Sequence, residues 1–105
     1  MEMNALDIAR EFKKRLGNQM PLIDMRLFGS CARGDNSRYS DLDIFVEIET
    51  LTRQAKAKIR EIAWQLGLDS EVVISPLIFS RFELEETALR SSPIVKAIKL
   101  EGVRI

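Results

Sequence analysis

The sequence predicts an α+β fold, in which a small mixed β-sheet has helices packed mainly on one face. The chain has 105 residues, of which 46% are hydrophobic, so it can bury one core and is expected to form a single domain over residues 1–105. Apolar residues recur at helical spacing in some segments and form short β-branched runs in others. The two kinds of segment follow one another without a repeat or linker, which indicates a mixed sheet with helices.

Helices are expected where apolar periodicity coincides with start and stop signals. The expected ranges are residues 4–16, 52–66, from 80 onward, and 92–100. Gly67 is placed to stop the second of these helices. Ser80 and Glu83 have the spacing of a capping box that opens the third. Ser92 followed by Pro93 is typical of the first residues of a helix, which predicts the fourth.

Strands are expected in four short segments. Their ranges are Met25–Phe28, Ser40–Ile48, Glu71–Phe79 and, as a short C-terminal strand, Val103–Ile105. Pro76 lacks an amide hydrogen, so it predicts an edge position, a bulge or an early end for the third strand. A brief helical turn after Ser30 and a polar loop through Asn36-Ser37 are expected to join the first two strands.

Composition narrows the possible functions. The formal net charge is zero, which disfavours a nucleic-acid-binding surface, and no apolar run approaches the roughly 20 residues of a membrane span. The single cysteine and the absence of a signal-peptide pattern favour the cytoplasm. The chain has no histidine, which excludes histidine general bases, Ser-His-Asp catalytic triads and metal sites with histidine ligands. Any metal would be a hard ion held by oxygens, with Mg²⁺ or Mn²⁺ first.

Gly29 and Ser30 end the first expected strand with a turn that suits an anion. Glycine lets another group approach the backbone closely, and the free N–H groups of the turn favour negative charge. Arg33 follows one turn later and could pair with phosphate oxygens. The alternative is an ordinary strand-to-helix turn with a surface arginine.

Asp41 and Asp43 lie at the start of the second expected strand, immediately before an apolar run. Residues two apart on a strand share a face, roughly 6.5 to 7 Å apart at Cα, so both carboxylates can bind one cation or bridge two. A divalent ion would also offset their mutual repulsion. The alternative is that Ser40-Asp41 caps a turn and Asp43 is an exposed strand residue.

The segment around Gly29 and Ser30 and the segment with Asp41 and Asp43 together resemble the sequence signature of a protein family. The pattern is Gly-Ser-x-Ala-Arg-Gly, a polar spacer, and Ser-Asp-x-Asp with an apolar tail, as in the minimal nucleotidyltransferases of the DNA polymerase β-like superfamily. The matching positions are Gly29, Ser30, Ala32, Arg33, Gly34, Ser40, Asp41 and Asp43. The resemblance implies one minimal nucleotidyltransferase domain.

The resemblance also implies a set of roles. Asp41 and Asp43 would be catalytic and hold Mg²⁺, with two ions bound and Mn²⁺ as a substitute. Gly29, Ser30, Arg33 and Ser40 would bind the nucleoside triphosphate. The reaction would transfer a nucleoside monophosphate, AMP from ATP, to a hydroxyl and release pyrophosphate.

A third carboxylate usually completes such a site and can act as a base. Glu71, at the start of the third expected strand, is the candidate for this catalytic and metal-binding role, and Asp69 is a weaker one. The family's acid lies inside that strand, where this chain has Ser75. Glu71 could instead be an exposed acid at the strand end. In that case the enzyme would be weak, inactive or dependent on a partner.

Minimal members of the family are often paired with a small helical HEPN-type protein, as antitoxins of toxin–antitoxin modules. The resemblance therefore implies that AMP could be added to a hydroxyl, such as a tyrosine, on that partner. A homodimer or a mixed complex is expected, because a small open sheet leaves apolar edges. Two alternatives remain open: an inactive nucleotide-binding module that neutralises or scaffolds a helical partner, and a domain that senses ATP.

Overall fold

A mixed sheet of order β3-β2-β1-β4 forms the centre of a computed structural model that describes residues 4–29 and 41–105. Its strands within these residues are β1 (Leu22–Phe28), β2 (Leu42–Ile48), β3 (Ile74–Ser80) and β4 (Val103–Arg104). β1 runs antiparallel to β2 and β4, whereas β2 and β3 are parallel. The α+β class and the mixed sheet are therefore confirmed.

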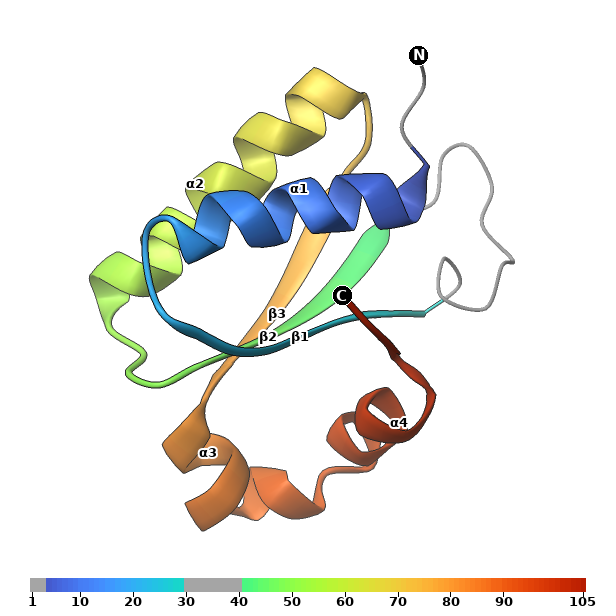
Figure 1. Ribbon diagram of the computed structural model, residues 1–105. Helices are drawn as coiled ribbons and strands as arrows, with labels where there is room; N and C mark the ends of the chain where they lie inside the picture. Colours follow the sequence, from blue (N-terminus) through green and yellow to red (C-terminus); the bar gives the residue numbers. More distant parts are fainter. Residues whose placement is uncertain (1–3, 30–40) are drawn as a thin grey trace.

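The two long helices, α1 (Ala5–Gly17) and α2 (Arg53–Ser70), lie on the same face of the sheet (Figure 1). Because side chains alternate along a strand, every second residue of β2 points to this face. These residues and the facing helix residues form the larger core, which includes Phe12, Leu16, Leu42, Ile44, Val46, Ile48, Ile59 and Leu66. This apolar layer fixes the position of β2.

The first two long helices begin close to the predicted residues, and each is capped at its first turn. At α1, the Asp7 amide donates to Asn4 Oδ1 at 2.8 Å, and the Asn4 amide donates back to Asp7 Oδ2. At α2, the Ala55 amide donates to Thr52 Oγ1 at 3.0 Å. Each bond satisfies a backbone group that the first turn leaves unpaired.

The predicted stop of α2 at Gly67 is wrong, because the helix continues to Ser70. Gly67 is buried, and a Cβ there would lie 2.7 Å from the Val72 carbonyl oxygen. Glycine is therefore needed for the close approach of the following chain rather than to end the helix. The helix ends at Glu71, whose φ of 58° is in the left-handed region.

The opposite face is covered by shorter elements, α3 (Arg81–Glu86), the 3₁₀ helix η1 (Ala88–Ser91) and α4 (Pro93–Glu101) (Figure 1). They bury a second, smaller core of Phe45, Phe79, Leu84, Val95 and Ile98. The Phe45 and Phe79 ring centroids are 5.8 Å apart. The long helices thus lie on one face, as expected, and the short ones cover part of the other.

The starts of three strands differ from prediction. β1 begins at Leu22, before the predicted Met25, β2 begins at Leu42, after the predicted Ser40, and β3 begins at Ile74, after the predicted Glu71. Pro76 lies within β3, which is an edge strand, so the predicted edge position is confirmed. The expected turn and loop between Ser30 and Ser40 lie outside the described residues. Among the helices of residues 4–29 and 41–105, none is long and apolar enough to cross a membrane.

Candidate functional site

Asp43 lies on β2 where three strands meet side by side. It is paired with Phe28, the last residue of β1, and with Ser75 on β3. Its neighbour Leu42 is buried in the core beneath α1 and α2, so Asp43 projects from the opposite face, which also carries Phe45. The Leu42 amide donates to the Val73 carbonyl at 2.8 Å, which fixes the start of β2 beside the chain that leads into β3.

The two aspartates act on each other electrostatically. Partial burial raises the pKa of the Asp43 carboxyl above its usual range, and the negative charge of Asp41 raises this pKa further. Asp41 itself is exposed, immediately before β2. Two neighbouring carboxylates, one of them partly removed from water, provide the oxygen ligands and the excess negative charge that suit Mg²⁺ or Mn²⁺. The residues therefore fit a hard divalent cation.

Gly29 brings the other half of the motif against Asp43. Its φ is +77°, a conformation that glycine adopts without penalty. A Cβ built on Gly29 would lie 2.5 Å from Asp43 Oδ2 and 3.4 Å from Asp43 Cγ. The Asp43 carboxylate thus occupies the space that any larger residue at position 29 would need. The end of β1 and the acidic start of β2 form one contiguous site.

Three of the predicted nucleotide-binding residues, Ser30, Arg33 and Ser40, lie outside the described residues. Of the predicted set, the structure therefore brings together Gly29, Asp41 and Asp43.

Glu71 is not brought to the aspartates. It is the exposed C-cap residue of α2 and precedes β3, rather than lying on it. Among residues 4–29 and 41–105, no three His, Cys, Asp or Glu residues are grouped so that they could hold a metal ion. Glu71 thus does not join the aspartates in the part of the chain that the structure describes, because the left-handed turn that ends α2 takes up residues 71–73 before the strand begins. Ser75 occupies the strand position beside Asp43. Asp69, the weaker candidate, is exposed and pairs with Arg15 at 3.9 Å.

Two further acids on the sheet are held by basic residues. Glu47, which is only 5% exposed, lies 3.5 Å from Lys99 Nζ on α4, and this ammonium also lies 5.7 Å from the Phe45 ring centroid. Asp24, the cross-strand partner of Glu47, pairs with Arg26 at 2.9 Å. These acids have a structural explanation that does not require a metal.

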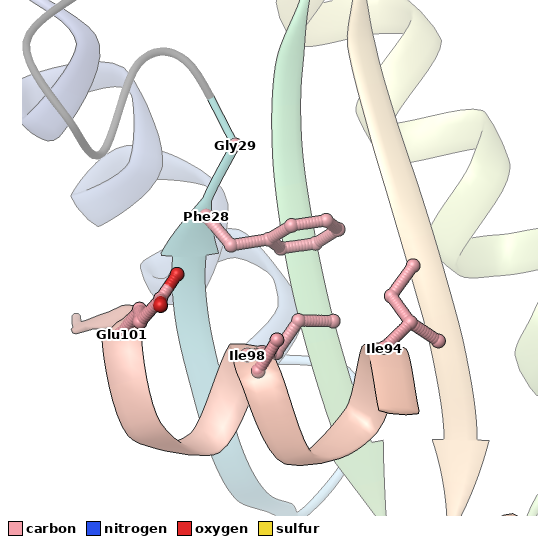
Figure 2. Close-up of a pocket in the computed structure, with 7 residues that line it drawn as sticks. Phe28, Gly29, Ile94, Ile98 and Glu101 are labelled. Atoms are coloured by element: carbon pink, nitrogen blue, oxygen red, sulfur yellow. The ribbon is translucent and has the colours of Figure 1, made fainter. Parts of the chain in front are cut away.

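Sequence reasoning missed a pocket beside Gly29. It has a volume of about 140 Å³ and lies between the end of β1 and α4 (Figure 2). Its lining includes Phe28, Gly29, Ile94, Ala97, Ile98 and Glu101. The four α4 residues have the spacing i, i+3, i+4 and i+7 of a single helix face, which was a detectable signal. What the sequence could not provide was the position of this helix face against the end of β1.

Comparison with known proteins identifies a family. Residues 7–103 match the family model described as a nucleotidyltransferase domain. A curated protein of Methanocaldococcus jannaschii, named "Putative protein adenylyltransferase", is 35% identical over 82 residues, which cover 75% of this chain and 83% of the relative. Both matches span the Gly29–Asp43 site.

Solved structures with the same fold agree. A structure described as "Crystal structure of the toxin-antitoxin with AMP-PNP" is 26% identical, covers 91% of this chain and 70% of its own, and has a TM-score of 0.62. A structure described as "Structure of putative minimal nucleotidyltransferase" is 20% identical in sequence. The match covers 98% of this chain and 97% of the other, with a TM-score of 0.63. A structure described as a "putative nucleotidyltransferase from Sulfolobus solfataricus" is 18% identical in sequence. The match covers 95% of this chain and 78% of the other, with a TM-score of 0.58. The last two show the fold alone. Taken with the family match over nearly the whole chain, the contact between Gly29 and the acidic start of β2 has a ready explanation: this chain belongs to the nucleotidyltransferase domain family.

Proposed function

We propose that this protein transfers AMP from ATP to a hydroxyl group, with Mg²⁺ or Mn²⁺ held by Asp41 and Asp43. The observation that carries the proposal is the contact of the Asp43 carboxylate with the Gly29 backbone, which joins an acidic metal-binding pair to a turn suited to phosphate. The family match supports the reaction type, and the name of the Methanocaldococcus relative supports adenylyl transfer.

Each residue has a proposed part. The Asp41 and Asp43 carboxylates supply the metal ligands, for one ion or for two that they bridge. In this proposal the Gly29 backbone, Ser30 and Arg33 bind the β- and γ-phosphates, and Ser40 also binds the nucleotide. When bound, Mg²⁺ would supply positive charge that stabilises the phosphate oxygens during transfer.

In the transfer step, the acceptor hydroxyl oxygen forms a bond to the α-phosphorus. The bond between the α-phosphorus and the bridging oxygen breaks, pyrophosphate leaves with that electron pair, and the hydroxyl proton passes to water. Because Gly29 has no side chain, the Asp43 carboxylate lies against its backbone, and the turn N–H groups offset the charge of the phosphates.

We further propose that the acceptor hydroxyl lies on a small helical protein of the HEPN type, in a mixed complex in the cytoplasm. The similarity to a toxin–antitoxin structure with AMP-PNP supports a nucleotide and a protein partner. The balanced net charge supports a protein rather than a nucleic acid as acceptor. In this role the chain would be the antitoxin.

A second candidate function is an inactive module that binds nucleotide and neutralises its partner by contact. The observation that favours it is Ser75, which lies beside Asp43 where a third carboxylate would complete the site. Catalysis and binding make different predictions for the same substitution, so one experiment separates them.

In the test, the protein is incubated with α-labelled ATP, Mg²⁺ and a purified small helical protein of the HEPN type, and the label on that partner and the released pyrophosphate are measured. Asp43→Asn should lower labelling at least about 100-fold, because metal ligation supplies several kcal/mol of transition-state stabilisation. Glu71→Gln is the matched control, since it makes the same chemical change away from the site, and should leave labelling within about twofold.

Equal loss in both variants would contradict the assignment of the site. Partner binding that persists with no labelling by the native protein would favour the inactive module. Tight ATP binding without turnover or partner binding would favour an ATP sensor.

A further inference from the structure

The pocket between the end of β1 and α4 is built for something other than phosphate. Phe28, Ile94, Ala97 and Ile98 make its walls apolar. In Figure 2 the Phe28 ring and the Ile94 and Ile98 side chains lie near one another, and the Glu101 carboxylate lies at the end of the group nearer Gly29. A carboxylate repels phosphate but accepts hydrogen bonds from hydroxyl and amino groups.

The pocket is continuous with the proposed phosphate site. Gly29 lines the pocket and also touches the Asp43 carboxylate, while Phe28 both lines it and is the cross-strand partner of Asp43. A molecule whose anionic end lies at Gly29 therefore has an apolar recess directly beside it. The volume of about 140 Å³ greatly exceeds the about 10–15 Å³ that one water needs.

We propose that this pocket binds the nucleoside part of the nucleotide, an inference that rests on the proposed function. The base packs against Phe28 and Ile94, since a purine has an apolar face that stacks on aromatic and aliphatic groups. Glu101 accepts a hydrogen bond from a donor of the nucleoside, as acidic residues do from ribose hydroxyls in other nucleotide sites. The triphosphate then extends past Gly29 toward Asp41 and Asp43.

This arrangement gives α4 a direct role in nucleotide recognition. Ile94, Ala97 and Glu101 are exposed, whereas Val95 and Ile98 anchor the same helix in the smaller core. The helix is thus held by one set of side chains and presents another set to the pocket. Substitutions at the exposed positions should change binding without unfolding the protein.

The test compares MgATP with magnesium tripolyphosphate, which has the phosphates but no nucleoside, by isothermal titration calorimetry. Ala97→Leu fills the pocket and should weaken ATP binding at least about tenfold, since base stacking is worth about 1–3 kcal/mol. Tripolyphosphate affinity should stay within about twofold. Lys96→Leu, at the adjacent exposed position outside the pocket lining, is the matched control and should change neither affinity.

The outcomes distinguish this inference from the proposed function. If Asp43→Asn weakens both ligands but Ala97→Leu weakens neither, the phosphate and metal site stands and the nucleoside pocket is wrong. If Ala97→Leu leaves ATP affinity intact but abolishes transfer to the partner, the pocket holds the acceptor, which also overturns the inference. If the native protein binds neither ligand, both proposals fail.

A second variant guards against misfolding. Glu101→Gln keeps the shape of an exposed side chain and removes its charge, so it tests the pocket should Ala97→Leu fail to fold. It should weaken ATP several-fold, because a charged acceptor is replaced by a neutral one, and should leave tripolyphosphate binding unchanged or slightly stronger. Stronger ATP binding by Glu101→Gln would contradict the hydrogen-bonding role.

Discussion

The two faces of β2 differ in a way that separates stability from chemistry. Toward α1 and α2, the strand presents Leu42, Ile44, Val46 and Ile48, all of which are 2% exposed or less. Toward α3 and α4, it presents Asp43, Phe45 and Glu47. The first face contributes burial of apolar surface, and the second combines an apolar centre with two acids. Side-chain alternation along one strand thus supports both a core and a functional site.

The two acids on the face toward α3 and α4, Asp43 and Glu47, differ in how their negative charge is compensated in the folded protein. Glu47 is paired with Lys99, whereas Asp43 lies partly buried beside another acid. Ionised Asp43 is therefore disfavoured in the folded metal-free protein. A binding site that lowers the stability of the protein until its ligand binds is typical of functional sites. Substitutions on the two faces of β2 should therefore change the stability of the metal-free protein in different ways.

The largest contrast should come from two adjacent residues of β2. Ile44→Ala removes buried apolar volume and should lower the free energy of unfolding by about 2–5 kcal/mol. Asp43→Asn should instead raise the melting temperature of the metal-free protein, because it removes a charge that folding disfavours. Urea and thermal unfolding of both variants test the contrast. If Asp43→Asn were as destabilising as Ile44→Ala, the two faces would not differ as described.

Gly29→Ala should affect both stability and ligand binding. The added Cβ meets Asp43 Oδ2, and a left-handed alanine costs roughly 1–2 kcal/mol, so both the unfolding free energy and the MgATP affinity should fall. Gly17→Ala is the matched control, since a Cβ there meets nothing within 4 Å and should be neutral or slightly stabilising. Unfolding and calorimetry measure both effects. Unchanged ATP affinity in Gly29→Ala would separate this glycine from the site.

Lys99→Ala should lower the stability of the protein, because it leaves the buried Glu47 carboxylate without its ion-pair partner. Without the ammonium, the Glu47 carboxylate stays buried against α4, so the free energy of unfolding should fall by about 1 kcal/mol, limited by the partial exposure of Lys99. Adding Glu47→Gln should restore part of this loss, because it removes the unpaired charge. Lys58→Ala, which breaks an exposed pair with Glu61, should have a smaller effect. An additive double variant would argue against the ion pair.

The smallest effect is the pH dependence of the metal-free protein. Because the folded-state pKa of Asp43 is raised, the folded state holds this proton more tightly than the unfolded state does. The contribution of Asp43 to stability is thus greatest below its ordinary pKa of 3.8 and is lost as pH rises through the raised value. The difference in melting temperature between the native protein and Asp43→Asn should widen over this window. A constant difference would show that the pKa is unshifted.

Local signals in the sequence predicted most of the helices and strands. Asn4, Thr52 and Ser80 start helices through short-range hydrogen bonds, which depend on residues three positions away and are visible in sequence. The sequence also indicated that Gly29 ends one strand and that Asp43 lies at the start of the next, and the pairing of Phe28 with Asp43 brings the two together.

Long-range packing determined what the sequence did not predict. Gly67 stays within α2 because the Val72 carbonyl passes close to it, and Glu71 adopts a left-handed φ that turns the chain before β3 begins. Both depend on how α2 meets the sheet rather than on neighbouring residues. The pocket was missed for the same reason, since Phe28 and Ile94 are far apart in the chain and meet only when α4 packs on β1.

The contact between residue 29 and residue 43 has a consequence for how this protein can vary. Because the Asp43 carboxylate fills the space where a side chain at position 29 would stand, position 29 can take a larger residue only if the side chain at position 43 moves or becomes smaller. A library randomised at both codons and selected for nucleotide binding should return glycine with aspartate far more often than their separate frequencies would give. The residues accepted at positions 29 and 43 should therefore depend on each other, although the two positions are far apart in the chain.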